Sequence, residues 1–216
     1  MTTRPRAVVT MPARATYLLG TAVVCWALAV TACGRADSPA TPPAVESLLL
    51  PIEDVRHIAD LDDLSADGAP VLSDPQPDPT APGPCKSVLD QQFIFGNEVT
   101  DFRTASYGAP THTGPGEIRG VAIVTQAVGV YPDDAGARSA FESLDPALAE
   151  CSALHAKNYE YHVTAPDTST LTLHSGVADI VNHVQGAVLI HITVVGLPDS
   201  GRIAQEVTEQ ITERLR

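Results

Sequence analysis

The stretch VADIVNHVQGAVLIHITVV, residues 177–195, contains the clearest hairpin pattern in this chain. Its two halves are rich in β-branched residues, which favour strands, and they join near Gln185 and Gly186. A glycine between two such apolar runs is typical of the tight turn of a β-hairpin. We therefore predict antiparallel strands at residues 177–184 and 187–195.

The two faces of this hairpin differ in character. Alternation places aliphatic residues on one face, the expected core face: Val177, Val181, Val188, Ile190, Ile192 and Val194. The other face is mixed and carries Ile180, Asn182, Leu189, His191, Thr193 and Val195. A turn at Gln185-Gly186 would set His191 opposite Ile180. Apolar walls with a few polar groups suit a ligand groove, and the same pattern suits a face covered by a helix or loop. The candidate ligand-binding residues are Asn182, Leu189, His191 and Thr193.

The segments around the hairpin extend it into a larger sheet with helices. Alternating apolar residues predict further strands at residues 99–107, 118–131, 159–165 and 169–175. Helical periodicity predicts helices at residues 51–60, from Cys85, after Asp133-Asp134 and after Asp199/Ser200. Consecutive hairpin strands with helices between them are typical of α+β proteins. The expected fold is a central antiparallel sheet of about five to six strands, with helices packed mainly on one face and one disulfide.

Residues 1–32 have the features of a lipoprotein signal peptide. Three arginines precede an apolar run of 14 residues, Tyr17–Val30, which is too short to span a membrane. The run ends in Val30-Thr31-Ala32-Cys33-Gly34, which looks like a bacterial lipobox. In a lipobox the cysteine thiol takes a diacylglycerol and cleavage frees the cysteine amine. We expect Cys33 to be the lipidated first residue of the mature chain, a palmitate-type lipidation. The alternative is an ordinary signal peptide with an incidental cysteine.

The acidic charge limits the partners of the mature chain. The full sequence has 13 Lys+Arg and 26 Asp+Glu, a formal charge of −13, and the predicted cleavage would remove three arginines. Nucleic acid is excluded as a partner because it requires a basic face, and anionic lipid headgroups repel an acidic surface. We therefore expect an extracytoplasmic protein held at the cell membrane by its lipid. Residues 33–45 would be a Pro/Ala-rich tether, and residues 46–216 the domain, with a proline-rich loop at residues 65–84.

Two of the four cysteines remain for the domain. Cys25 lies in the signal peptide and Cys33 is the predicted lipidation site. In an oxidising exported setting an even pair of cysteines is read as a disulfide, so we expect Cys85 and Cys151 to be bonded. Two free buried thiols or a two-cysteine metal site are the alternatives, and no CxxC or CxxH spacing favours a metal.

The sequence contains none of the familiar catalytic motifs GxSxG, HExxH, GxxxxGK[ST] or GxGxxG. We therefore predict no catalytic residues, no metal and no cofactor. Asp63, Ser65, Asp67, Gly68 and Asp74 do have the spacing of a calcium-binding EF-hand loop. The last position is Asp instead of Glu and no helix is predicted after it, so we interpret these residues as an acidic, solvated loop.

Several segments together resemble a known family. They are the lipobox, the helix in LLLPIEDV after the tether, the proline-rich stretch before Cys85, Cys151 at the end of a helix, and the ending AVLIHITVVGLPDSGRIAQEV. Over about residues 46–216 the chain resembles the PknH-like extracellular sensor domain, found on mycobacterial Ser/Thr kinases and as stand-alone lipoproteins. The resemblance implies an α+β domain with a cleft for an unidentified ligand and no catalytic residues. It also implies that Cys85 and Cys151 match the first of the family's two disulfides, while the second pair is missing here.

These observations favour a lipid-anchored, non-catalytic lipoprotein of the cell envelope. Its sensor-like domain would bind an unidentified small molecule, wall fragment (glycan) or lipid. The alternatives are a protein-interaction accessory of the envelope and an envelope hydrolase with unrecognised residues. A cleft with a Ser–His contact would favour the hydrolase, an apolar cavity a lipid carrier, and an exposed apolar patch a protein partner.

Overall fold

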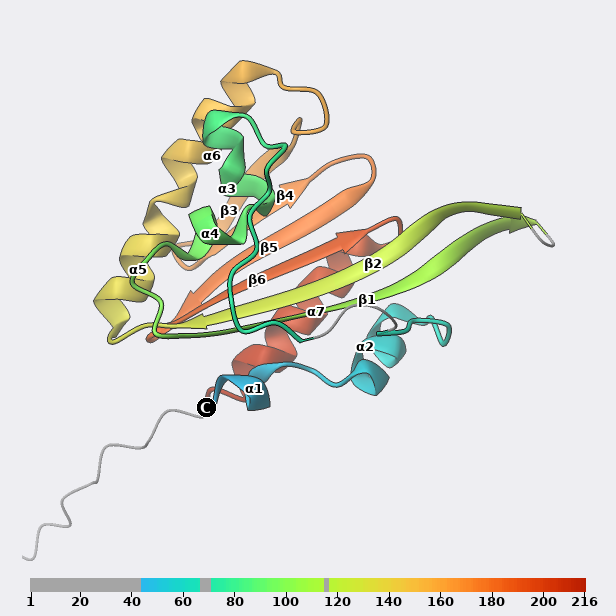
Figure 1. Ribbon diagram of the computed structural model, residues 1–216, viewed down its shortest axis with the longest axis horizontal. Coiled ribbons are helices and arrows are strands. Elements are labelled where there is room, and N and C mark those ends of the chain that lie inside the picture. The colour runs from blue at the N-terminus through green and yellow to red at the C-terminus, as the bar shows by residue number, and fades with distance from the viewer. Residues whose placement is uncertain (1–43, 67–70, 115–116) are drawn as a thin grey trace, which may run out of the picture. The chain divides into compact units, whose positions relative to one another are not determined.

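The computed structural model describes residues 44–66, 71–114 and 117–216, apart from the side chains of residues 112–119. The predicted signal peptide, Cys33 and most of the predicted tether lie outside these residues. In chain order the elements are α1 (Val45–Leu48), α2 (Ile52–Ala59), the 3₁₀ helix η1 (Gly83–Cys85), α3 (Lys86–Leu89), α4 (Gln91–Phe95), β1 (Asp101–Gly114), β2 (Glu117–Val130), α5 (Asp134–Glu142), α6 (Leu144–Leu154), β3 (His162–Asp167), β4 (Thr170–His174), β5 (Ala178–Gln185), β6 (Val188–Val195) and α7 (Ser200–Glu213) (Figure 1).

The six strands described form one antiparallel sheet in the order β1-β2-β6-β5-β4-β3 (Figure 1). Every predicted strand is present, and this confirms the α+β fold with a central antiparallel sheet. β2 pairs with β6 only from Ile123 to Val130, so the far part of the β1–β2 hairpin projects beyond the other strands (Figure 1). β1 and β3 are the two edges of the sheet.

The β5–β6 hairpin turns one residue later than predicted. Its two-residue loop is Gly186-Ala187 instead of Gln185-Gly186, and Gly186 takes a φ of +56°, which glycine adopts without steric cost. His191 therefore lies opposite Asn182 and not opposite Ile180. The register differs from the prediction by two residues, which leaves each side chain on its predicted face.

Helices cover both faces of the sheet, which differs from the predicted placement mainly on one face. α1, α2 and α7 share one hydrophobic cluster with the aliphatic side of β6. Residues of α3, α4, α5 and α6 form a second cluster with the opposite side. The reason lies in β6, since every residue from 188 to 194 is buried and a strand buried on both faces needs cover on both. Val177, expected on the core face, lies in the turn before β5 and is exposed.

The helix boundaries follow some of their sequence signals. Asp133 caps α5, because its carboxylate accepts a hydrogen bond from the N–H of Gly136 at 2.9 Å. Asp199 also occupies an N-cap position, but its side chain makes no cap bond to α7. The break between α5 and α6 lies at Ser143, and Pro146 falls in the first turn of α6, where proline is tolerated.

Cys85 and Cys151 form the predicted disulfide, with their Cα atoms 4.6 Å apart. Both cysteines are buried, and their bond ties η1 to α6. Both hydrophobic clusters and the disulfide lie within residues 41–216, which form one compact unit. This unit carries its own core, so it is expected to fold without the residues before it.

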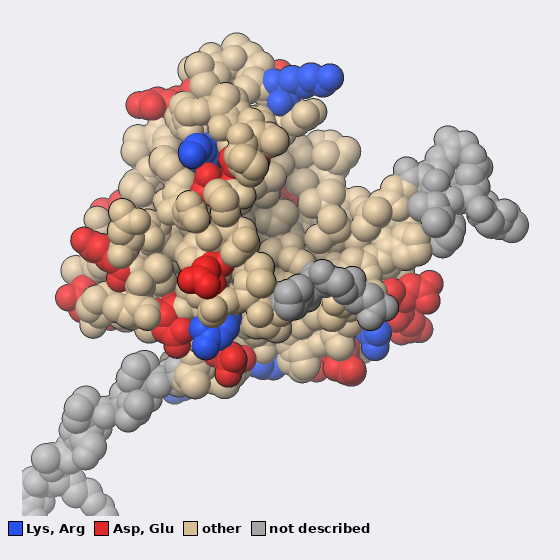
Figure 2. Space-filling model, in the orientation of Figure 1, with Lys and Arg blue, Asp and Glu red and all other residues tan. Residues whose placement is uncertain are grey.

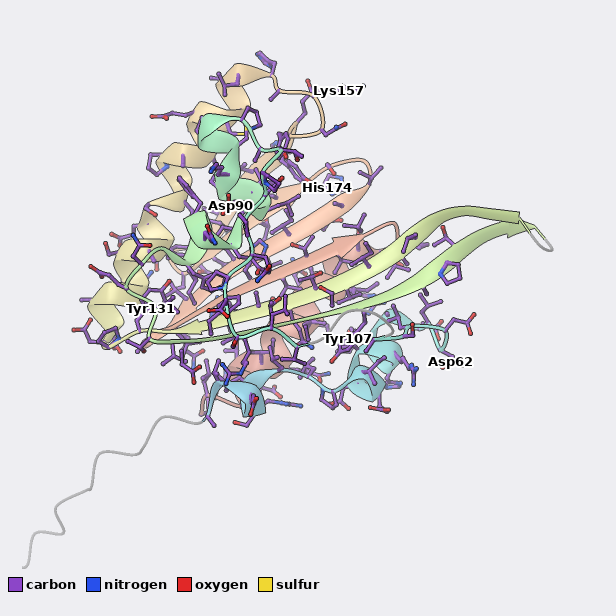
Figure 3. All side chains as sticks on the ribbon, viewed as in Figure 1. Asp62, Asp90, Tyr107, Tyr131, Lys157 and His174 are labelled. Carbon is purple, nitrogen blue, oxygen red and sulfur yellow. A yellow bond between two sulfur atoms is a disulfide. The ribbon has the colours of Figure 1, made fainter. Side chains whose placement is uncertain are left out.

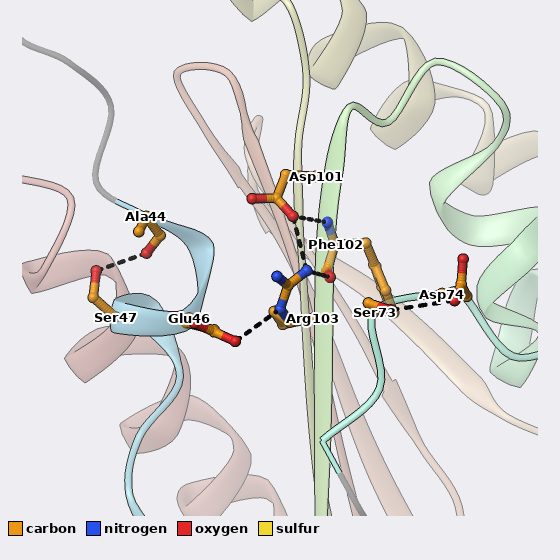
Figure 4. A network of polar contacts seen from close by, with 8 residues as sticks. All are labelled: Ala44, Glu46, Ser47, Ser73, Asp74, Asp101, Phe102 and Arg103. Carbon is orange, nitrogen blue, oxygen red and sulfur yellow. Dashed lines mark hydrogen bonds and ion pairs between the residues drawn. The ribbon is translucent and has the colours of Figure 1, made fainter.

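The segment that precedes α2 is held against the sheet by polar contacts. The buried side chain of Gln126 accepts from Leu50 N at 2.8 Å and donates to Leu50 O at 2.7 Å. The hydroxyl of Tyr107, labelled in Figure 3, also donates to Leu50 O at 3.1 Å. At the surface, Arg103 of β1 reaches Glu46 of α1 at 3.3 Å (Figure 4). These contacts hold the first described residues of the domain, from α1 to Leu50, against strands β1 and β2.

Candidate functional site

An opening on the α3–α6 side of the sheet reaches the mixed face of β6. It is a groove of about 270 Å³ lined by residues of β1, β2 and β6 and of the segment before α3. Figure 1 shows this segment running across the strands on its way to α3. We call this opening the hydroxyl groove. It is lined by Leu72, Gln76, Pro77, Leu89, Gln91, Thr104, Ser106, Thr125, His191 and Thr193.

The floor of the hydroxyl groove is a row of hydroxyl groups from three neighbouring strands. Strand pairing sets Thr125 of β2 between Ser106 of β1 and Thr193 of β6. The hydroxyl oxygens of Ser106 and Thr125 are 2.8 Å apart, so one donates to the other. Residues two apart on a strand share a face, and Thr104 and His191 therefore continue the floor by one row.

His191 connects this floor to a buried amide. Its Nδ1 lies 2.8 Å from Oδ1 of Asn182, and its Nε2 lies 3.0 Å from the hydroxyl oxygen of Thr193. A carbonyl oxygen only accepts hydrogen bonds, so Nδ1 carries the proton and Nε2 accepts from the threonine. Burial disfavours the imidazolium and lowers the pKa of His191 from 6.5 to about 4. His191 is therefore a neutral ring held in one orientation.

The outer wall of the groove is held by backbone and amide contacts. Leu72 exchanges two backbone hydrogen bonds with Thr104, each 3.0 Å long. The Gln91 side chain accepts from Gln76 N at 3.0 Å and donates to the Thr104 hydroxyl at 3.2 Å. Gln91 N also donates to Gln76 O at 2.9 Å. The wall thus sets a fixed amide beside the row of hydroxyls.

The hydroxyl groove is uncharged on a strongly acidic protein. None of the described side chains that line it belongs to Asp, Glu, Lys or Arg. Figure 2 shows acidic side chains spread over the same face of the molecule, around a largely uncharged centre. Uncharged donors and acceptors between apolar walls suit a ligand that carries hydroxyl or carbonyl groups and no net charge.

Thr193, His191 and Asn182 form a hydroxyl–imidazole–amide chain, the type of contact that would favour a hydrolase. A general base works best with a pKa near the working pH, and the pKa of His191 is about 4. Asn182 lacks the negative charge with which a triad carboxylate stabilises an imidazolium. Thr193 also lies mid-strand between two paired neighbours, which use the backbone N–H groups that an oxyanion hole needs. These three hydrogen-bonded side chains therefore position hydrogen-bonding groups and are poorly suited to catalysis.

The structure brings two of the four predicted ligand residues into the groove. His191 and Thr193 line it, and Asn182 lies behind His191 with no exposed surface. Leu189 is buried in the cluster formed by α3, α4, α5 and α6, so it supports the sheet and does not reach the groove. The part of these residues in ligand binding stays a prediction.

The pattern of β5 and β6 alone does not predict most of the residues that line the hydroxyl groove. The hydroxyls of Ser106 and Thr125 share one face of β1 and β2, a signal that is visible as alternation in each strand. Only the strand order β1-β2-β6 sets them beside Thr193. Gln76 and Gln91 come from irregular or short elements and carry no periodic signal.

The described residues contain no group of three or more His, Cys, Asp or Glu placed to hold a metal ion. His162 and His174 are paired across β3 and β4, and His174 Nδ1 lies 2.6 Å from a carboxylate oxygen of Asp179. Asp67 and Gly68 of the calcium-like spacing lie outside the described residues.

Comparison with known proteins assigns this fold to a family. The sequence profile of the PknH-like extracellular domain matches residues 40–214. The chain belongs to this family. Among solved structures it is similar to the crystal structure of the extracellular domain of PknH from Mycobacterium tuberculosis, with a TM-score of 0.62 and 15% identity over 81% of this chain and 97% of that chain. None of the curated proteins matches the chain.

The likeness to the PknH structure, at 15% identity, shows a shared fold alone. Membership of the PknH-like extracellular domain family implies that the domain lies outside the cytoplasm, in keeping with its disulfide. Among the described helices, none combines the length and apolar character required to cross a membrane.

Proposed function

We propose that this PknH-like extracellular domain belongs to a lipid-anchored, non-catalytic envelope lipoprotein and binds a small, uncharged, hydroxyl-bearing ligand in the hydroxyl groove. The row of uncharged hydroxyls at Ser106, Thr125 and Thr193 carries the proposal. Hydroxyls donate and accept, so they complement the hydroxyls of a sugar unit or a similar small polar molecule.

The fixed partners of the floor determine what each group offers to a ligand. The Thr193 hydroxyl donates a hydrogen bond to His191, so its oxygen can accept a hydrogen bond from the ligand. Gln91 uses one amide hydrogen on Thr104 and has a second hydrogen to donate. The groove therefore presents acceptors along the sheet and a donor at the wall, with Leu72 to cover an apolar ring face.

The size and polarity of the groove favour a small polar ligand over a lipid. Ligand pockets commonly measure roughly 300–1,000 Å³, and this groove of about 270 Å³ lies just below that range. An acyl chain laid on the floor would strip water from several hydroxyls without replacing their hydrogen bonds, which is unfavourable. A single sugar residue of a wall fragment, or a free small molecule of similar polarity, fits better.

The lipid anchor is tested by the cysteine at the lipobox. We expect the full chain to partition with membranes and to show, by intact mass, a mature form that begins at Cys33 and carries a diacylglycerol. Cys33→Ala should release the protein from the membrane fraction while the fold stays unchanged. Continued membrane association of Cys33→Ala would contradict the lipid anchor and leave the groove unaffected.

The ligand is sought first with residues 41–216 purified from an oxidising compartment. Native mass spectrometry beside denaturing intact mass should reveal a co-purified small molecule that disappears on denaturation. A panel of neutral monosaccharides and disaccharides, followed by amide NMR, should then perturb β1, β2 and β6 at the groove.

Matched variants decide whether the groove is the binding site. Thr125→Val and Thr193→Val remove hydroxyls from the floor and keep the side-chain shape, so each should weaken sugar binding roughly tenfold. Thr172→Val lies on the opposite face of β4 and should leave binding unchanged. Equal binding by all three variants, or a ligand that carries a net charge, would refute the proposed site.

A further inference from the structure

The two edge strands of the sheet, β1 and β3, differ in whether another described segment pairs with them. The outer edge of β1 is bridged by Ser65, which exchanges two backbone hydrogen bonds of 2.9 Å with Gly108, and by Leu72, which pairs with Thr104. No described segment bridges the outer edge of β3 in this way. An open edge is a template for another strand, so β3 is the edge at which a further strand can pair with this sheet.

The pairing of β4 shows which backbone groups of β3 are free. Ser169 O accepts from Val184 N, and Ser175 N donates to Ala178 O, both at 2.9 Å, at the two ends of β4. Hydrogen-bonded pairs alternate along an antiparallel ladder. Odd-numbered residues of β4 therefore bond to β5, and even-numbered residues bond to β3.

The same alternation applies to β3 itself. His162 and Thr164 face even-numbered residues of β4, so their N–H and C=O groups are used within the sheet. Val163, and Ala165 at the start of the bulge that follows, direct theirs outward. Residues of β3 are exposed or half-buried along its whole length, so these groups are accessible.

A groove of about 460 Å³ runs along this open edge, between β3 and α6. We call it the edge groove. α6 contributes Asp145, Leu148, Ala149 and Ser152, which share one helix face by their spacing. Val163 contributes an apolar surface above the buried Leu148 and Leu171, and the small side chains of α6 leave room along the edge.

The described lining of the edge groove contains one carboxylate, that of Asp145, and one histidine, His162. Asp145 lines it near one end, and Glu160 lies in the adjoining hollow at the other end, with Ser152. Neither lining includes a Lys or Arg. The whole chain has a formal charge of −13, so a basic segment is attracted and a second copy of this chain is repelled.

We propose that the edge groove binds an extended, net-basic segment of another protein, which adds to β3 as a further strand of the sheet. The backbone of the segment pairs with Val163 and Ala165, and alternate side chains of small or medium apolar type rest on Leu148 and Leu171. A basic side chain at the end of the segment, in register with the apolar ones and so on the same face, approaches Asp145. Backbone pairing supplies affinity in this mode of recognition, and the pockets for alternate side chains supply specificity.

The probe is the capped heptapeptide Lys-Thr-Val-Thr-Val-Thr-Lys, which sets its valines and both lysines on one face, added to residues 41–216. Hydrogen exchange followed by NMR should show fast exchange at the Val163 and Ala165 amides in the free protein and protection on binding. The amides of His162 and Thr164 should be protected in both states. The same peptide N-methylated at each valine lacks the central donors of the pairing edge and should not bind.

Two charge reversals on α6 separate local from overall electrostatics. Asp145→Lys should weaken peptide binding by roughly fivefold, because an attraction at the edge groove becomes a repulsion. Glu150→Lys makes the same change of charge on the same helix outside the lining and should leave binding within roughly twofold. Val163→Pro removes an outward N–H and should abolish binding, with the circular dichroism spectrum showing that the fold is kept.

Other outcomes overturn the proposal. Equal binding of the N-methylated peptide, equal effects of the two lysine variants, or perturbations mapped to β1 would each exclude strand addition at β3. Dimerisation of the free domain that is lost in Val163→Pro would assign the edge to a second copy instead. Thr193→Val should leave peptide binding unchanged, so failure of the hydroxyl groove and failure of the edge groove are distinguishable.

Discussion

Replacing His191 tests the physical basis of the hydroxyl groove, because this residue is both buried and titratable. In the folded protein burial lowers the pKa of His191 to about 4, whereas in the unfolded chain it is near 6.5. The unfolded state therefore binds more protons between these two values. Stability from the neutral ring is complete above about pH 6.5 and is lost progressively as the pH falls to about 4.

The size of the effect follows from this difference in pKa. A depression of one pKa unit corresponds to about 1.4 kcal/mol, so the whole effect is roughly 3 kcal/mol once the pH is below 4. Between pH 7.5 and pH 5 about 2 kcal/mol of this is expected. The window lies above the pH at which most carboxylates titrate. The pKa of His183 is also lowered, mainly by burial, and adds a loss of the same sign.

Urea unfolding of residues 41–216 at pH 5 and pH 7.5 measures the effect. His191→Gln keeps hydrogen-bonding groups at the groove and removes the titration, so its free energy of unfolding should change about 2 kcal/mol less between the two pH values than the parent protein's. His183→Gln is the control for the second lowered pKa. An unchanged pH dependence in His191→Gln, or an imidazole that titrates near 6.5 by NMR, would refute the assignment of a neutral, buried ring.

Two further predictions concern stability. Joint replacement of Cys85 and Cys151 by serine should lower the free energy of unfolding by about 4 kcal/mol, because the bond closes a loop with a sequence separation of 66 residues; chemical denaturation measures the loss, and an unchanged midpoint would contradict it. Gly129→Ala should cost about 1–3 kcal/mol, because the added carbon would lie 2.5 Å from the Phe95 ring. Gly176→Ala, which meets no atom within 4 Å, is the matched control, and equal costs would refute the clash.

The sequence predicted the fold well where periodicity is strong. The six predicted strands, the helix that begins after Asp133 and the pairing of Cys85 with Cys151 are confirmed. The register of β5 and β6 was wrong by two residues, since a Gln-Gly and a Gly-Ala loop differ by one position and both keep the same face inward. Local pattern alone does not distinguish them.

The placement of helices and the full lining of the groove were harder to predict. The mixed face of β6 suits a groove and a covered face equally, and the structure has both: Leu189 and Asn182 are covered, while His191 and Thr193 reach an opening. Which part stays open depends on where irregular residues such as Gln76 cross the sheet. No sequence period encodes that path.

The two faces of β6 differ in a way that stability alone does not explain. One face carries Val188, Ile190, Ile192 and Val194, all buried in an aliphatic cluster. The other face, on the same strand, buries His191 and Thr193 against Asn182, whose Nδ2 is a buried nitrogen without a hydrogen-bond partner among the described residues.

A buried polar group without a partner costs about 1–3 kcal/mol, and an apolar residue at Asn182 would remove that cost. Polar networks that lower stability are typical of sites where the side chains serve another purpose. On β6 two members of this network, His191 and Thr193, also line the hydroxyl groove. One face of β6 therefore contributes aliphatic side chains to the core. The other face holds neutral hydrogen-bonding groups in fixed positions, which is the arrangement that the proposed ligand site requires.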